Sequence, residues 1–195
     1  MSPRHFFLMA ATAAALSCGA SPSLAQVEDP GFALFKQACL DTRGDPVAAA
    51  AVVAGQDWTE RPIVQPHLIG ARTRIKSDGL QVFQVTTAKA EIDPEFAVSD
   101  VCQVHVQLVD GPVPGRDPAA AALRWLGRDG GPAMTEPTVT AFVLHGAERP
   151  VVVDQSAIGD HVASGDLANI IILRDGSSVL LMYATLRPAT AEPQP

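Results

Sequence analysis

Residues 167–186 of the chain read LANIIILRDGSSVLLMYATL, and this stretch carries the strongest indication of the fold. Its two apolar runs, IIIL and VLLM, flank Asp175-Gly176, a dipeptide typical of tight hairpin turns. Neither run alternates with polar residues, as a strand with one solvent-exposed face would. We therefore expect two central strands of a sheet, 167–173 and 178–186, with helices on one face and other structure on the opposite face.

Alternation of apolar and polar residues predicts further strands upstream of this hairpin. The segments 69–76 and 80–87 flank Ser77-Asp78-Gly79, which is a second hairpin signal, and 138–145 and 151–154 are two shorter candidates. The chain therefore contains at least two adjacent strand pairs, which is the pattern of an antiparallel sheet.

The segment 101–109 shows the clearest alternation. Cys102 and three aliphatic residues lie on one side of this predicted strand, while Gln103, His105 and Gln107 lie on the other. We expect Cys102 to face the core and His105 to face solvent.

Three Asp-Pro pairs mark helix starts, because Asp caps a helix N-terminus and Pro suits the first helical position. The pairs at 29–30 and 45–46 precede short helical patterns, and the pair at 117–118 precedes a longer one. We expect an α+β fold: a mainly antiparallel sheet with an N-terminal helical hairpin and one further helix packed on it. No repeat or linker divides the chain, so residues 26–187 are expected to form a single domain and 188–195 a disordered tail.

The first 25 residues read as a secretory signal peptide. Arg4 and His5 precede an uncharged apolar run over 6–16, and Ser23-Leu24-Ala25 forms a small-x-small cleavage site. An uncleaved anchor or an ordinary buried helix is the alternative, but the run is shorter than the roughly 20 residues of a membrane span. A faint lipoprotein box ending at Cys18 is a second alternative, which would leave Cys18 lipidated. The pattern favours cleavage near Ala25 and a periplasmic or secreted protein without a membrane span.

Composition narrows the possible partners. The chain has a formal net charge of −7, and loss of Arg4 with the leader makes the exported form more acidic. Such a balance argues against nucleic-acid binding, which relies on Lys and Arg to neutralise phosphates. Hydrophobic residues make up 47% of the chain and charged residues 18%, which indicates a globular protein rather than a disordered one.

Cysteine usage predicts one disulfide. Removal of Cys18 with the leader leaves Cys39 and Cys102, and two cysteines in an oxidising compartment usually pair. The alternative is two separate buried thiols that act as small apolar side chains. No CxxC occurs, so neither a thioredoxin-like redox site nor a zinc knuckle is indicated.

The N-terminal pattern resembles that of a group of small exported proteobacterial proteins without an assigned activity. The shared features are Phe35-x-x-x-Cys39-Leu40, Asp45-Pro46 with its alanine run, and Trp58. The resemblance covers about thirty residues. It implies a packing pattern, adds some support to the disulfide, and carries no functional residue over.

The segment 154–166 is the one place where catalytic residue types gather. Ser156, His161, Ser164 and Asp166 include a serine, a histidine and a carboxylate, the types that act as nucleophile, base and orienting group in hydrolases. Ser, Asp and Gly are also the ordinary residues of turns, because their side chains satisfy backbone groups. The turn interpretation is favoured, and a hydrolase is the alternative.

A basic stripe is the second candidate site. Arg72, Arg74 and Lys76 project from one face of a predicted strand and would suit a small anionic ligand or an acidic protein partner. Charges on a strand also keep a sheet edge from pairing with other chains, and this protective role is favoured.

No metal site or cofactor is predicted, because the histidines lack ligand spacing and no glycine-rich phosphate loop joins a strand to a helix. Taken together, the sequence predicts a small non-catalytic periplasmic binding or interaction protein.

Overall fold

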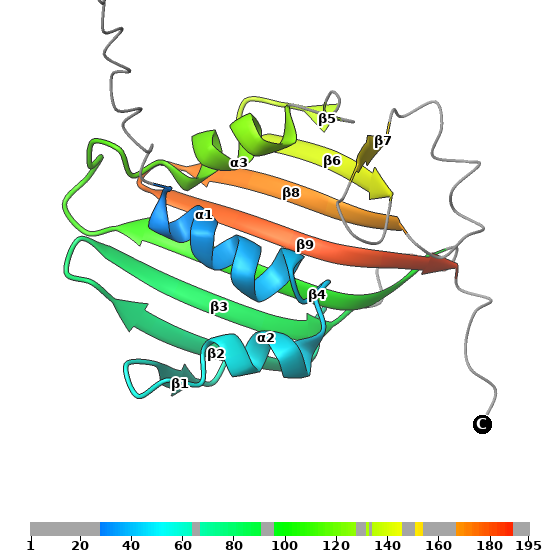
Figure 1. Cartoon of the computed structure of the whole chain (residues 1–195), viewed down its shortest axis with the longest axis horizontal. Coiled ribbons are helices and arrows are strands. Elements are labelled where there is room, and N and C mark those ends of the chain that lie inside the picture. Colours follow the sequence, from blue (N-terminus) through cyan, green and yellow to red (C-terminus); the bar gives the residue numbers. More distant parts are fainter. Residues whose placement is uncertain are drawn as a thin grey trace, which may run out of the picture.

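The computed structural model describes residues 28–63, 67–90, 96–127, 132, 134–145, 151–153 and 167–188. Within them the chain forms one antiparallel sheet of nine strands and three α-helices, so the α+β class is confirmed, with most of the structure in the sheet (Figure 1). The predicted signal peptide, Cys18 and the C-terminal tail beyond residue 188 lie outside the described residues.

The helices begin where the Asp-Pro pairs predict. Asp29, Asp45 and Asp117 each accept a hydrogen bond from the backbone N–H three residues later, at 2.9, 2.7 and 2.8 Å. The helices are α1 (Pro30–Phe35), which continues into a π-helical turn η1 (Lys36–Leu40), α2 (Pro46–Val52) and α3 (Pro118–Leu126). None of the described helices has the length and apolar character required to cross a bilayer.

The sheet has the order β1-β2-β3-β4-β9-β8-β6-β5, and β7 pairs with β6. The two strands of the C-terminal hairpin are therefore central, as the apolar runs predict. The strands β1 and β5, with three and two residues, were not predicted. Their bounds, in chain order, are β1 Thr59–Arg61, β2 Ile69–Ser77, β3 Gln81–Lys89, β4 Phe96–Leu108, β5 Met134–Thr135, β6 Val139–His145, β7 Val151–Val153, β8 Leu167–Asp175 and β9 Ser178–Pro188.

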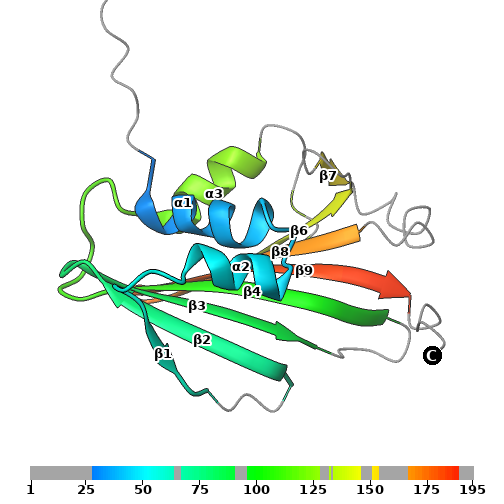
Figure 2. The same ribbon diagram turned by 60° about the horizontal axis from the view of Figure 1, so that its bottom comes forward.

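The main core lies between the sheet and the helices, which all cover the same face (Figure 2). Alternation along β4 places Cys102, Val104 and Val106 in this core, each with 1% exposure or less. The disulfide between Cys39 of η1 and Cys102 is confirmed, with a Cα–Cα distance of 5.3 Å. It fixes the helical layer to the middle of the sheet.

The opposite face carries no helix among the described elements (Figure 2), yet it is not uniformly exposed. A second, smaller apolar cluster there contains the buried residues Val101, Ala184 and Ala90, with Met182 and Leu186 packed against it. The strand β9 is thus apolar on both faces because it contributes to two cores. Toward the β8–β9 turn this second cluster ends, and the side chains become half-buried.

Candidate functional site

A hollow on the helix-free face lies where the second cluster ends. The register places Gln84 of β3 opposite His105 of β4, His105 opposite Leu180 of β9, and Leu180 opposite Leu173 of β8. These four side chains form one row across four neighbouring strands, and all of them line the same pocket. At the usual spacing of about 4.8 Å between strands, the row spans about 14 Å.

Three more side chains complete the pocket. Gln103 extends it along β4, while Ser178 and Asp175 close the end beside the β8–β9 turn. The volume is about 270 Å³, and the hollow is open to solvent. That is close to the lower end of the range for small-molecule sites, which are mostly apolar with a few placed polar groups.

His105 is the ionisable group at the centre of this pocket. Its Nε2 lies 2.5 Å from Ser178 Oγ, so one of the two atoms donates a hydrogen bond to the other. Desolvation by burial lowers the pKa of His105 below its ordinary value of 6.5. The ring is therefore neutral at physiological pH, and the floor of the pocket carries no formal charge from it. Asp175, at the exposed end, is the one carboxylate among the lining residues.

Several polar groups in the pocket have unused hydrogen-bonding capacity. Among the described residues, the Gln84 amide has no hydrogen-bond partner, and Gln103 has one weak contact, from Nε2 to Met182 Sδ at 3.4 Å. With Nε2 of His105 engaged by Ser178, its Nδ1 remains without a partner in the same set of residues. Half-buried polar atoms in this state favour a bound water or ligand, because leaving them unpaired costs free energy.

The basic stripe predicted from the sequence lies on the other face of the sheet, beside α2. Arg74 Nη1 donates to the backbone carbonyl of Val53, at the C-terminal end of α2, at 2.8 Å. Lys76 Nζ forms an exposed ion pair with Asp57 at 3.1 Å. Two of the three cations are thus used in contacts that hold α2 and its following loop against the sheet.

Arg72 is the member of the stripe that makes no such contact within the described residues. It is exposed, and within the described residues no hydrogen bond or ion pair engages its guanidinium. With Arg74 and Glu60 it lines a hollow of about 30 Å³, enough for water rather than for a ligand. The middle of β2 is paired on both sides. The β1 residues Thr59–Arg61 lie opposite it on one side, and β3 lies on the other.

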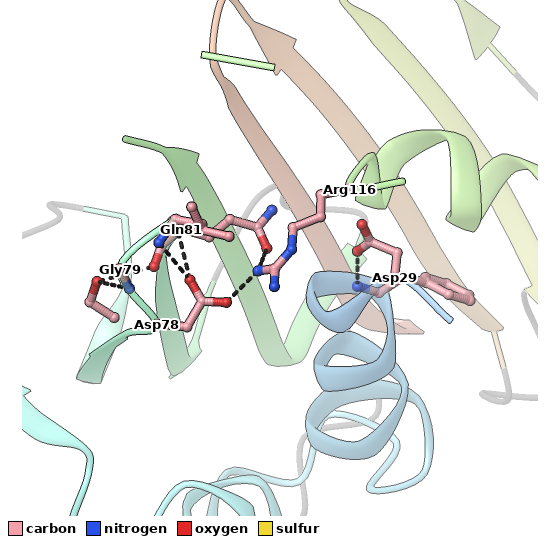
Figure 3. A network of polar contacts seen from close by, with 8 residues as sticks. Asp29, Asp78, Gly79, Gln81 and Arg116 are labelled. Carbon is pink, nitrogen blue, oxygen red and sulfur yellow. Dashed lines mark hydrogen bonds and ion pairs between the residues drawn. The ribbon is translucent and has the colours of Figure 1, made fainter. Parts of the chain in front are cut away.

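A separate polar network joins the β2–β3 turn to the loop before α3. Arg116 Nη1 donates to Asp78 Oδ2 and to Gln81 Oε1, the latter at 2.9 Å (Figure 3). Asp78 also caps the turn through the backbone N–H groups of Leu80 and Gln81. The network therefore ties the turn to this loop, although Gln81 Nε2 is buried and has no hydrogen-bond partner in the described part of the chain.

The candidate catalytic residues Ser156, His161, Ser164 and Asp166 lie outside the described residues, so the loop hypothesis stays a prediction. In the part of the chain that the structure describes, no group of three or more His, Cys, Asp or Glu side chains could hold a metal ion. No protein-family model, curated protein or solved structure matches this chain.

The pocket residues were not singled out as a site by the sequence, and the expectation of a solvent-exposed His105 was wrong in one respect. The ring does point to the helix-free face, but it is half-buried and shares a pocket with Ser178 and Leu180. The available signal was the alternation Gln103-x-His105-x-Gln107, which places neutral polar groups on a strand. Whether these polar residues line a pocket depends on β9, which supplies their apolar neighbours.

Proposed function

We propose that this protein is a non-catalytic binding protein that holds a small ligand on the helix-free face of its sheet, in the pocket around His105. The observation that carries the proposal is the set of unengaged polar groups on Gln84, Gln103 and His105, placed beside Leu173 and Leu180. A partly apolar hollow with a few convergent polar groups is how small-molecule sites are usually built.

The proposal is tested by a screen of fragments of mixed charge, followed by ¹H–¹⁵N correlation spectra of the labelled protein. Binders should shift the backbone signals of pocket residues, and these shifts should disappear in Leu180→Arg, whose longer side chain fills the hollow. Gln107→Arg is the matched control, because Gln107 lies on the same face of β4 but is exposed and does not line the pocket. A screen without any binder at the pocket contradicts the proposal.

A hydrolase is the second candidate function, and one observation favours it. Ser178 and His105 lie within hydrogen-bond distance inside a pocket, as a nucleophile and its general base do. In such a pair a third group usually orients the base, yet no described residue forms a hydrogen bond with Nδ1 of His105. The binding function therefore requires no orienting group beyond the residues that line the pocket. The alternative site at Ser156, His161, Ser164 and Asp166 remains a further proposal.

The proposed compartment is the periplasm or the exterior of the cell, after removal of residues 1–25. The Cys39–Cys102 bond supports this, because such bonds form and persist in oxidising compartments. The intact mass of protein recovered from the periplasm should correspond to a chain beginning at Gln26. A lipid-modified chain that begins at Cys18 would show the lipoprotein route instead.

The stripe of Arg72, Arg74 and Lys76 remains a proposed surface for an anionic ligand or an acidic partner. Because Arg74 and Lys76 already bond Val53 and Asp57, Arg72 would make the main contribution. Charge reversal by Arg72→Glu should then weaken the binding of such a partner. The remaining binding should depend less on salt concentration.

A further inference from the structure

We propose that the ligand of the His105 pocket is an uncharged amphipathic molecule, with an apolar body against Leu173 and Leu180 and a carboxamide or hydroxyl group bound by Gln84, Gln103 and His105. This inference rests on the proposed function and deepens it, since it names the chemical class that the pocket accepts.

The first argument is the way the row across the pocket divides between strands. In this row β3 and β4 contribute Gln84 and His105, with Gln103 beside them on β4, whereas β9 and β8 contribute Leu180 and Leu173. The polar Ser178 and Asp175 of the same two strands lie at the end of the pocket beside the turn. One half of the row is therefore polar and the other half apolar, and the division runs between β4 and β9. A molecule that lies across the strands meets hydrogen-bonding groups at one end and aliphatic side chains at the other.

The second argument is charge. No Lys or Arg is among the described residues that line the pocket, and Asp175 is the one formally charged group there. An anionic head group would find no cation, and the carboxylate of Asp175 would repel it. A cation gains little from Asp175, because that residue is exposed and exposed ion pairs contribute little to binding. The ligand groups that complement this pocket are therefore neutral hydrogen-bond donors and acceptors.

The third argument is the kind of hydrogen bond on offer. A glutamine side chain presents both N–H donors and a carbonyl acceptor, and His105 Nδ1 adds a donor or an acceptor according to its tautomer. A primary carboxamide or a hydroxyl group likewise both donates and accepts, so it can satisfy these groups together. A purely apolar ligand would instead leave them buried and unpaired, which costs binding free energy.

The test compares three probes with the same number of carbon atoms: octanamide, octanoate and octylamine. Each is titrated into the labelled wild-type protein at neutral pH. Octanamide should bind tightest, with shifts at the pocket residues. Its affinity should fall about fivefold in Gln103→Ala and in Gln84→Ala, the usual loss for one neutral hydrogen bond. Gln107→Ala, on the same face of β4 outside the pocket, should retain wild-type affinity.

The outcomes separate this inference from the function on which it rests. Tighter binding of octanoate or octylamine at the pocket overturns the ligand class and leaves the binding function standing. If none of the three binds while the fragment screen finds other binders there, the ligand class alone is again overturned. A screen without pocket binders overturns both. Dispersed spectra of each variant establish that a lost affinity does not come from unfolding.

Discussion

Gly31 lies directly against Val106, so that a Cβ built on Gly31 would stand 2.7 Å from Val106 Cγ2. Pro118 Cβ lies 3.2 Å from the same point. The first turn of α1 therefore contacts both β4 and the start of α3 with no space for a methyl group. This close approach, rather than any unusual backbone angle, is why glycine occupies the position.

The change Gly31→Ala should lower the free energy of unfolding by about 1–3 kcal/mol, the usual cost of adding a methyl group to a well-packed core. Urea-induced unfolding followed by circular dichroism measures it. Gly55→Ala is the matched control, because the nearest atom to a Cβ there is Trp58 Cδ1 at 3.9 Å, an ordinary contact. Equal stabilities of the two variants would contradict the packing argument.

The Cys39–Cys102 bond should be a major contributor to stability. Replacing both cysteines by serine is expected to cost about 2–5 kcal/mol, the usual loss when a native disulfide is removed from a small domain. Alkylation of the denatured protein without reductant should label neither Cys39 nor Cys102, whereas prior reduction should expose both thiols. Labelling of both thiols in the unreduced protein would show that the bond is absent.

His105 should make the fold less stable in mild acid. Because burial lowers its pKa in the folded protein, the unfolded chain takes up the proton first as the pH falls through about 6.5. The stability that the neutral ring provides is present above that pH and is lost as the pH falls through the lower folded pKa. In His105→Gln, the decrease in unfolding free energy between pH 7 and pH 5 should be smaller than in the wild type.

Two checks accompany this comparison. His67→Gln removes a histidine from an exposed turn and controls for the loss of one titratable group. An unchanged pH dependence in His105→Gln would mean that the ring is not desolvated.

Asp29 should show the opposite dependence. Desolvation raises the pKa of its buried carboxyl, and the nearby Asp117 carboxylate raises it further. The stability that protonation of the folded Asp29 provides is therefore fully present below the unfolded pKa of about 3.9. It is lost as the pH rises through the higher folded pKa. Asp29→Asn retains the acceptor for the Phe32 N–H and removes the charge, so it should equal or exceed the wild type in stability at pH 7.

The advantage of Asp29→Asn should vanish in acid, where the wild-type carboxyl is protonated. Urea midpoints measured from pH 4 to pH 7 test this. Asp29→Ala, which removes the N-cap acceptor altogether, should lose about 0.5–2 kcal/mol and serves as the comparison. A pH-independent difference between Asn and Asp would disprove the role of charge.

A serine-reactive phosphonate probe separates the two functions at the level of chemistry. A binding protein should not be labelled at Ser178, Ser156 or Ser164. Stoichiometric labelling of Ser178 that is lost in His105→Gln would establish the hydrolase at the described pocket. Labelling of Ser156 or Ser164 that depends on His161 would place it in the 154–166 loop instead.

The sequence predicted the elements well because their signals are local. Asp-Pro pairs mark the starts of α1, α2 and α3, and alternation marks β2, β3, β4 and β6. The strands β1 and β5 have three and two residues, too few to show a period, and both lie at the ends of the strand order.

The pocket could not be predicted because it depends on a distant pairing. His105 and Ser178 are 73 residues apart, and they meet because β4 pairs with β9 along the edge that β3 leaves open. From the sequence alone, Gln84, Gln103 and His105 are ordinary polar residues of separate strands. Only the register shows that Gln84 and His105 share a row with Leu180 and Leu173, with Gln103 beside this row along β4.

The strand order also has a consequence for how the chain reaches its folded state. The C-terminal hairpin of β8 and β9 enters between β4 and β6, which are both synthesised earlier. Until that hairpin arrives, β4 has β3 on one side and an unsatisfied edge on the other, and such edges invite pairing with other chains. Completion of the sheet depends on contacts between residues distant in sequence, and such contacts slow folding. Cys39 and Cys102 both precede the hairpin, so oxidation can fix η1 to β4 first and shield one face of that strand while its edge is still open.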